Sequence, residues 1–146
     1  MNNGKVTSYC SRGIRNNNPG NIRITSDKWQ GQKPKSESQD KVFVTFYHVD
    51  FGLRALCVLL HNYIIMGYDT PRKIISRYAP PNENFTDYYV GFVASFFDND
   101  EHHRISYNTD DFFRLMHAIC DFESGYDFTF SHYKQLFLTF KLDYLK

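Results

Sequence analysis

The sequence of 146 residues lacks a long hydrophobic run, since its longest apolar stretch covers only Ala55 to Leu60. A membrane-spanning helix needs about 20 such residues, so we expect no membrane insertion. The opening residues, MNNGKVTSYCSR, lack the apolar core of a secretory signal, which predicts synthesis in the cytoplasm without a signal peptide. Cysteine is scarce as well, and an odd count of three excludes a dense disulfide scaffold.

An excess of charge of one sign is also missing, because 17 Lys and Arg face 16 Asp and Glu. The signs are nevertheless unevenly distributed. Residues 1–41 contain eight basic and three acidic residues, so this third of the chain would attract an anionic partner. With 23% charged and 18% aromatic residues, we expect one folded domain over 12–146, preceded by a flexible lead-in over 1–11.

The residue pattern predicts an α+β fold that is mainly helical, with a small N-terminal β element followed by about five helices. The β element would combine the turn at Asn18-Pro19-Gly20-Asn21 with a strand over 42–47, a run of β-branched and aromatic residues. Apolar spacing and capping residues predict the helices. They are expected over 50–66 with Asp50 as cap, over 71–78 after Thr70, after a cap at Asn84 or Thr86, over 109–124 before Gly125, and over 131–142.

One carboxylate interrupts an apolar helical face. In the helix expected over 109–124, the stripe of Phe112, Met116 and Ile119 continues, at steps of three or four, at Phe122 and Glu123. Burial there would raise the pKa of Glu123 and keep it protonated near neutral pH, as a general acid requires. The alternative is that the helix end opens to solvent and Glu123 lies at its rim.

Two Cys–His pairs, Cys57 with His61 and His117 with Cys120, have the spacing of zinc ligands on two packed helices. Buried free cysteine and core histidine are the commoner reason for such pairs. We therefore expect no metal and no cofactor.

The segment RGIRNNNPGNIR (12–23) combines arginine and asparagine with a tight turn. It is compatible with three roles. Its Arg side chains and backbone N–H groups could bind phosphates or nucleic acid, its side chains could bond the carbonyls of the loop itself, or the loop could line a substrate groove.

An ordered series of segments carries a family resemblance. RGIRNNNPGNIR, WQG (29–31), FVTFYHVDFGLRAL (43–56) and RYAPPNENFTDYY (77–89) resemble a family of small phage and prophage proteins often labelled virion structural proteins. The resemblance covers residues 12–125. Glu123-Ser124-Gly125 stands where these proteins end their last helix in Glu-Asn-Gly.

A more distant similarity is to flagellar-type β-N-acetylglucosaminidases of the lysozyme-like superfamily. Their Asn-Asn, Trp-x-Gly and Tyr-Ala segments occur here in the same order from Asn17 onwards, while Glu-Ser-Gly has moved from the front to the end, as in a circular permutation. This similarity implies a lysozyme-like fold and cleavage of peptidoglycan glycan strands, by a glycosidase or a lytic transglycosylase, with Glu123 as the catalytic general acid.

The same similarity implies further site residues. The expected substrate-binding residues are Arg15, Asn17, Asn18, Asn21, Trp29, Tyr78 and Tyr88. A hydrolase would also need a second carboxylate, for which the candidates are Asp27, Glu37, Asp40 and Glu83. For Glu83 we favour a structural role at the Pro-Pro loop or the helix that follows.

The expected partner is peptidoglycan, reached at the bacterial cell wall or periplasm by injection, lysis or secretion, with a virion or secretion-system component or an immunity protein as a second partner. Nucleic acid is not expected. Two other classes remain open: a non-enzymatic virion or baseplate protein, and a nucleic-acid or anti-defence binding module that uses the Arg-rich turn. The enzyme hypothesis requires Glu123 to lie within reach of the 15–21 turn across an open groove.

Overall fold

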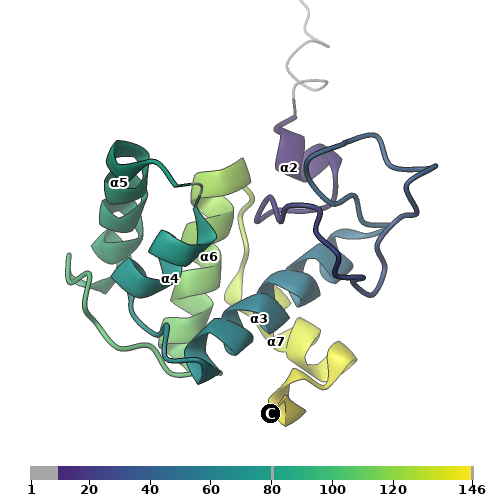
Figure 1. Cartoon of the computed structure of the whole chain (residues 1–146). Helices are drawn as coiled ribbons and strands as arrows, with labels where there is room; N and C mark the ends of the chain where they lie inside the picture. Colours follow the sequence, from purple (N-terminus) through teal and green to yellow (C-terminus); the bar gives the residue numbers. More distant parts are fainter. Residues whose placement is uncertain (1–9, 80, 146) are drawn as a thin grey trace, which may run out of the picture.

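A computed structural model describes residues 10–79 and 81–145, and these residues are mainly helical, as predicted (Figure 1). Of the lead-in expected over 1–11, residues 1–9 lie outside the described residues. Ser11 is described, and it caps the first described helix. The α-helices are α2 (Arg12–Arg15), α3 (Val49–Ile65), α4 (Pro71–Tyr78), α5 (Glu83–Ala94), α6 (Asp110–Ser124) and α7 (Phe130–Phe140), with short 3-10 helices η1 (Ser95–Phe97) and η2 (Leu142–Tyr144).

Local capping chemistry sets the bounds of α4 and α6, where the predictions are confirmed. The Thr70 hydroxyl accepts from the N–H of Lys73, and Pro71 occupies the first helical position. Thr109 caps α6, and Gly125 ends it in the left-handed conformation that glycine adopts without strain.

The predicted caps of α3 and α5 are wrong. His48 caps α3 by accepting from the N–H of Asp50, whose carboxylate bonds instead to His132 of α7. Asn82 caps α5 by accepting from the N–H of Phe85, so the helix begins before the predicted caps. The last helix also begins earlier than predicted, at Phe130.

The predicted strand over 42–47 is not formed. Two isolated antiparallel bridges, Arg23–Phe43 and Gln32–Phe46, are the only β pairing within the part of the chain that the structure describes. Residues 42–47 still bond the backbone of segments on both sides, since the N–H of Val44 donates to the carbonyl of Ile22 and that of Tyr47 to the carbonyl of Gly31. These bonds are divided between several segments and form no continuous ladder, and asparagine side chains bond further carbonyls. Asn18, for example, donates to the carbonyls of Ile22 and Val44.

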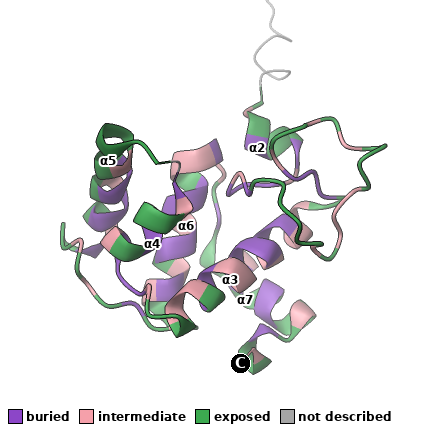
Figure 2. Ribbon diagram, viewed as in Figure 1, coloured by how far each residue is buried: buried purple, intermediate pink, exposed green. Residues whose placement is uncertain are grey.

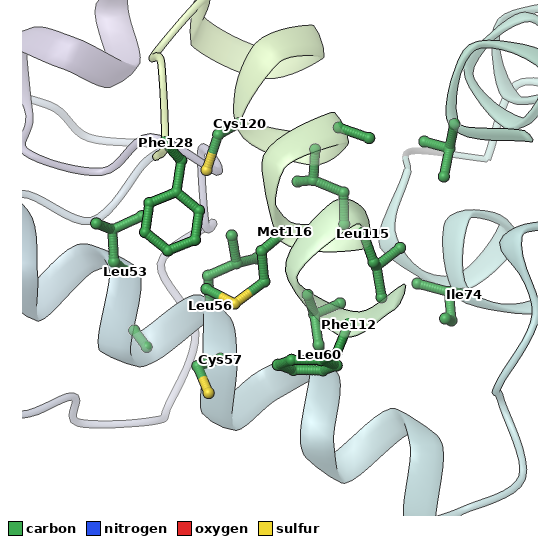
Figure 3. Close-up of a cluster of buried hydrophobic side chains, with 14 of the residues drawn as sticks. Leu53, Leu56, Cys57, Leu60, Ile74, Phe112, Leu115, Met116, Cys120 and Phe128 are labelled. Carbon is green, nitrogen blue, oxygen red and sulfur yellow. The ribbon is translucent and has the colours of Figure 1, made fainter. Parts of the chain in front are cut away.

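The core lies between α3 and α6 (Figures 2 and 3). Residues one helical turn apart on each helix are buried against the other, and Phe128 covers the end of this contact. The principal core side chains are Leu53, Leu56 and Leu60 of α3, Phe112, Leu115, Met116 and Ile119 of α6, and Ile74 of α4. Within residues 10–79 and 81–145, no helix is both long and apolar enough to cross a membrane.

Candidate active site

The N-terminal turn is fastened to the C-terminal end of α6. The Ser124 hydroxyl donates to the carbonyl of Pro19 at 2.8 Å, and the Ser11 hydroxyl donates to the carbonyl of Ser124 at 2.8 Å. The backbone of Gly13 comes so close that an added Cβ would lie 2.8 Å from the Ser124 Cβ. Only glycine fits this approach, and the contact joins segments about one hundred residues apart in sequence.

Glu123 is held by this turn. The Asn21 side-chain amide donates to the Oε1 and to the backbone carbonyl of Glu123, both at 3.0 Å. Asn21 has a φ of 51°, a left-handed conformation that asparagine tolerates better than most residues. Glu123 therefore lies within reach of the Asn-rich turn, as predicted, but the turn contacts it directly and does not face it across a groove.

Burial raises the pKa of the half-buried Glu123 carboxyl above its ordinary value. The hydrogen bond from Asn21, the positive charge of Arg23 and the nearby Tyr89 hydroxyl, which lies close to the carboxyl without forming a hydrogen bond of normal geometry, oppose this effect without cancelling it. The helix end therefore does not release the carboxyl fully into solvent, and its environment favours the protonated form.

Two tyrosines lie close to this carboxyl. The Tyr78 hydroxyl donates to the carbonyl of Gly20, so it helps to hold the turn. The Tyr89 ring stacks on Phe122 with centroids 3.8 Å apart, and its buried hydroxyl has no hydrogen-bond partner among the described residues. Burial, and next the negative charge of Glu123, raises the pKa of both tyrosines, so each remains a neutral donor.

Glu123 lines a cleft of about 440 Å³ between the N-terminal segment and helices α3 to α6. Its walls combine aromatic side chains with two carboxyl groups, Glu123 and Asp27, and two guanidinium groups, Arg23 and Arg77. The predicted site residues in this cleft are Asn21, Asp27, Trp29, Tyr78 and Glu123. Flat apolar faces beside charged groups suit a ligand with the mixed surface of a sugar.

Three further residues of the turn, Arg15, Asn17 and Asn18, bond the protein's own backbone. Arg15 donates to the carbonyl of Cys10, and Asn17 donates to that of Phe46. Asn18 is buried. These three residues do not line the Glu123 cleft, and their contacts match the role of holding the loop together.

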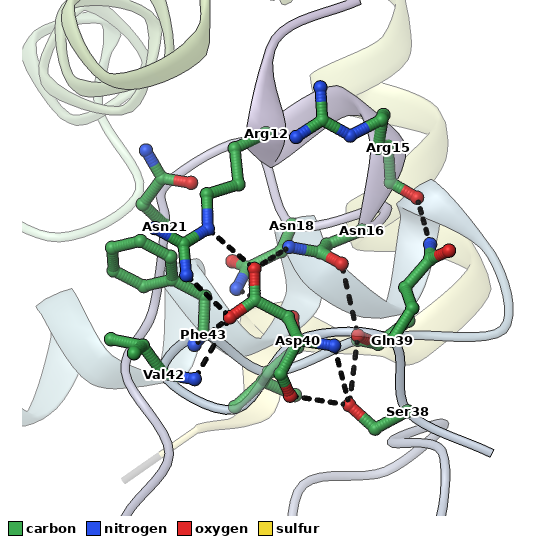
Figure 4. Close-up of polar contacts among 12 residues, drawn as sticks. Arg12, Arg15, Asn16, Asn18, Asn21, Ser38, Gln39, Asp40, Val42 and Phe43 are labelled. Carbon is green, nitrogen blue, oxygen red and sulfur yellow. Dashed lines mark hydrogen bonds and ion pairs between the residues drawn. The ribbon is translucent and has the colours of Figure 1, made fainter.

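Asp40 organises the loop that faces this turn. Its carboxylate accepts from the Arg12 guanidinium at 2.6 and 2.8 Å, from the Asn16 amide and from the N–H groups of Val42 and Phe43 (Figure 4). These donors hold the pKa of Asp40 far below its usual range. A carboxylate with this many partners is a structural anchor.

The remaining predicted residues lie outside the Glu123 cleft. Glu37 is exposed and accepts from the Tyr47 hydroxyl, while Glu83 occupies the first turn of α5. Tyr88 is 70% exposed, and its ring centroid lies 6.0 Å from that of Phe122. Among the four candidate second carboxylates, Asp27 alone shares the cleft with Glu123.

The Cys–His pairs make contacts typical of a core. Cys57 lies 3.5 Å from the Tyr107 hydroxyl, and burial raises the pKa of its thiol to about 12. His117 lies 3.1 Å from the carbonyl of Phe128. Among residues 10–79 and 81–145, no three His, Cys, Asp or Glu side chains are grouped as metal ligands.

Sequence reasoning missed part of the cleft wall. Phe43, Leu59 and Tyr63 of α3, and Phe85 come from three segments that are separate in sequence, and each looks like an ordinary core residue. Arg77 could have been found, because it directly precedes Tyr78 in the RYAPP motif. Its guanidinium lies over the rings of Tyr63 and Tyr68 at the edge of the cleft.

No known protein-family profile matches the chain. It is 32% identical over 120 residues to Protein P5 of Pseudoalteromonas phage PM2, and the match spans 80% of this chain and 72% of that phage protein. The phage relationship expected from the RGIRNNNPGNIR series is therefore confirmed, and the chain belongs to the family of Protein P5 of phage PM2.

Proposed function

We propose that this protein cleaves the glycan strands of peptidoglycan, with Glu123 as the general acid. The observation that carries the proposal is the half-buried carboxyl with a raised pKa at the wall of an aromatic cleft, held by Asn21. A carboxyl group whose pKa is raised keeps its proton to higher pH and can donate it to a glycosidic oxygen.

The polar atoms around Glu123 support an acid–base role. The Oδ1 of Asn21 and the hydroxyl of Tyr89 are buried and lack partners within the described residues. Unpaired buried polar atoms cost about 1–3 kcal/mol each, so a folding role alone does not account for them. In this proposal the Oδ1 of Asn21 accepts from a substrate hydroxyl, and the Tyr89 hydroxyl donates to the Glu123 carboxylate once its proton has left.

Cleavage of the glycosidic bond can proceed by either of two reactions, hydrolysis or ring closure. Glu123 protonates the glycosidic oxygen as the bond from that oxygen to the anomeric carbon breaks. In a hydrolase, water adds to the anomeric carbon and its proton passes to a carboxylate. In a lytic transglycosylase, a hydroxyl of the same sugar closes a ring, and its proton returns to Glu123.

Asp27 is our choice for the second carboxylate if the enzyme is a hydrolase, because it lines the same cleft as Glu123. Asp40 is excluded from this role by its bonds to Arg12 and the surrounding backbone. A lysozyme-like arrangement permuted in sequence would explain why the acid ends α6 and meets a turn that precedes it by 102 residues.

The test is the release of soluble fragments from purified sacculi of several wall types. We expect Glu123→Gln to lower the rate by at least about a hundredfold, because removing an acid–base group costs about 10²–10⁴ in rate. The matched control is Asp121→Asn, which removes one carboxylate from an exposed position on the same helix and should retain activity.

Mass analysis of the released fragments separates the two chemistries, since the ring-closed product of a transglycosylase lacks one water. Asp27→Asn should abolish hydrolysis but spare ring closure. Wild-type protein that releases nothing from any wall type would contradict the proposal and leave a non-enzymatic virion role.

A further inference from the structure

A second cleft adjoins the one that contains Glu123. It has a volume of about 910 Å³ and lies within the N-terminal segment between Ile24 and Thr45. Thr25 and Trp29 line both clefts, so a ligand extending past Trp29 passes from one to the other.

The second cleft is strongly basic. Four lysines line it: Lys28, Lys33, Lys35 and Lys41. None of them forms an ion pair within residues 10–79 and 81–145, although Lys33 lies over the Tyr47 ring. Asp40 is the acidic residue of the lining, and Arg12 already pairs with it. Four uncompensated positive charges around one concavity favour an anionic occupant.

The cleft is lined by lysine rather than arginine, and this difference indicates which class of anion it binds. Arginine is preferred for bidentate recognition of nucleic-acid phosphates, but the two arginines of α2 are used internally, Arg12 by Asp40 and Arg15 by the carbonyl of Cys10. The cleft instead offers mobile ammonium groups beside an indole ring. This arrangement suits separate carboxylates on a flexible chain.

We propose that the lysine cleft binds the carboxylate-bearing peptides that branch from the glycan strand held in the Glu123 cleft. The inference rests on the proposed function and adds to it a preference for peptide-substituted wall. The peptide passes Trp29 and places its carboxylates among the four lysines, which would fix the glycan strand relative to Glu123.

The test measures binding apart from cleavage. Every protein carries Glu123→Gln, and sedimentation measures its affinity for Gram-negative sacculi, which lack phosphate-rich wall polymers. The sacculi are used intact or after an amidase has removed their peptides. We compare K35Q/K41Q with the control K73Q/K134Q, which removes the same charge from exposed positions in α4 and α7.

We expect K35Q/K41Q to bind intact sacculi about three- to tenfold more weakly, as the loss of two exposed ion pairs implies, and to bind peptide-free glycan unchanged. The control should match the parent on both. Equal affinity of K35Q/K41Q and its parent for intact sacculi would overturn the inference, as would an equal loss on peptide-free glycan. Tighter, Lys35- and Lys41-dependent binding to a short DNA duplex would overturn it in favour of nucleic acid.

Failure of the inference is distinguishable from failure of the proposed function, because fragment release is measured separately with the native Glu123. If the native protein releases fragments but binding does not depend on the peptides, the peptide-binding role of the lysine cleft is refuted and the proposed catalysis is retained. Peptide-dependent binding without fragment release refutes catalysis and retains the carboxylate site.

Discussion

The side-chain amide of Asn21 bonds both the carboxyl oxygen and the backbone carbonyl of Glu123, each at 3.0 Å, across 102 residues of sequence. The two bonds fix the carboxyl relative to the end of its own helix. Because Ser124 also bonds the carbonyl of Pro19, the position of the acid depends on the docking of the N-terminal turn.

Replacement of Arg23 should change the pH profile of cleavage. The proposed acid acts while protonated, so the rate falls as pH rises through the pKa of Glu123. The positive charge of Arg23 lowers that pKa. Arg23→Gln should therefore shift the falling limb to higher pH, measured as initial rates of fragment release over the whole pH range in which the protein stays folded.

Lys134→Gln is the control for the Arg23 profile, since it removes a positive charge from α7 away from the cleft. Its profile should coincide with that of the wild type. Coincidence of the Arg23→Gln profile with the wild type would show that another group controls the falling limb.

Gly13→Ala should separate the turn from α6. The added Cβ would meet the Ser124 Cβ at 2.8 Å and the carbonyl oxygen of Asn18 at 2.9 Å, so the backbone must shift. We expect a loss of about 1–3 kcal/mol in the free energy of unfolding, measured by urea denaturation. Activity should fall at least tenfold in conditions where the variant is folded, because the bonds from Asn21 to Glu123 lengthen.

Gly91→Ala is the matched control for Gly13→Ala. Its added Cβ would meet no atom within 4 Å, and the position is exposed within α5. The free energy of unfolding should rise by about 0.5–1 kcal/mol, with activity unchanged. A Gly13→Ala variant with wild-type activity would mean that the docking of the turn does not position the acid.

The sequence predicted those features that local chemistry determines. The boundaries of α4 and α6 were predictable, because Thr70 with Pro71, and Thr109 with Gly125, act on their immediate neighbours. The cap of α3 was not, because Asp50 has a long-range alternative in His132. The strand over 42–47 failed similarly, since its backbone bonds are divided between Asn16 and the segments 22–24 and 31–33, so that only isolated bridges form.

The residues of the candidate site were likewise predictable only where a local pattern or motif marked them. Glu123 was identifiable because a carboxylate interrupts an apolar stripe, and a family motif pointed to Trp29 and Tyr78. Composition could not distinguish an asparagine that faces the cleft, such as Asn21, from one that bonds its own backbone, such as Asn18. That difference arises from which turn residue meets α6, a tertiary contact.

Asp40→Asn should destabilise the N-terminal segment by about 2–3 kcal/mol at pH 7, because Arg12 and two backbone N–H groups lose an ionised acceptor. Because the pKa of Asp40 is lowered in the folded protein, its ionised form stabilises the fold at pH values above about 4, the pKa of an aspartate in the unfolded chain. This contribution declines as pH falls toward the folded pKa.

The difference in stability between wild type and Asp40→Asn should therefore narrow below about pH 4, in urea titrations repeated from pH 7 to pH 2. Asp121→Asn, at an exposed position, supplies the baseline and should stay within about 0.5 kcal/mol of the wild type at pH 7. A difference that does not change with pH would indicate that the Asp40 network does not depend on its charge.

Tyr89→Phe separates a folding role from a functional role for the unpaired hydroxyl. If the hydroxyl served only the fold, its removal would lower stability, yet it has no partner among the described residues. We expect Tyr89→Phe to raise the free energy of unfolding by up to about 1 kcal/mol, because a buried unpaired polar group is removed while the stack on Phe122 remains.

The same variant should cleave more slowly at pH values below the falling limb, by more than its change in stability explains, and its falling limb should move to higher pH. The Tyr89 hydroxyl favours the ionised form of Glu123, and it would stabilise the carboxylate that remains after proton donation. We expect a loss of about tenfold in kcat with little change in KM. Full activity in a more stable Tyr89→Phe protein would show that the hydroxyl is not part of the catalytic site.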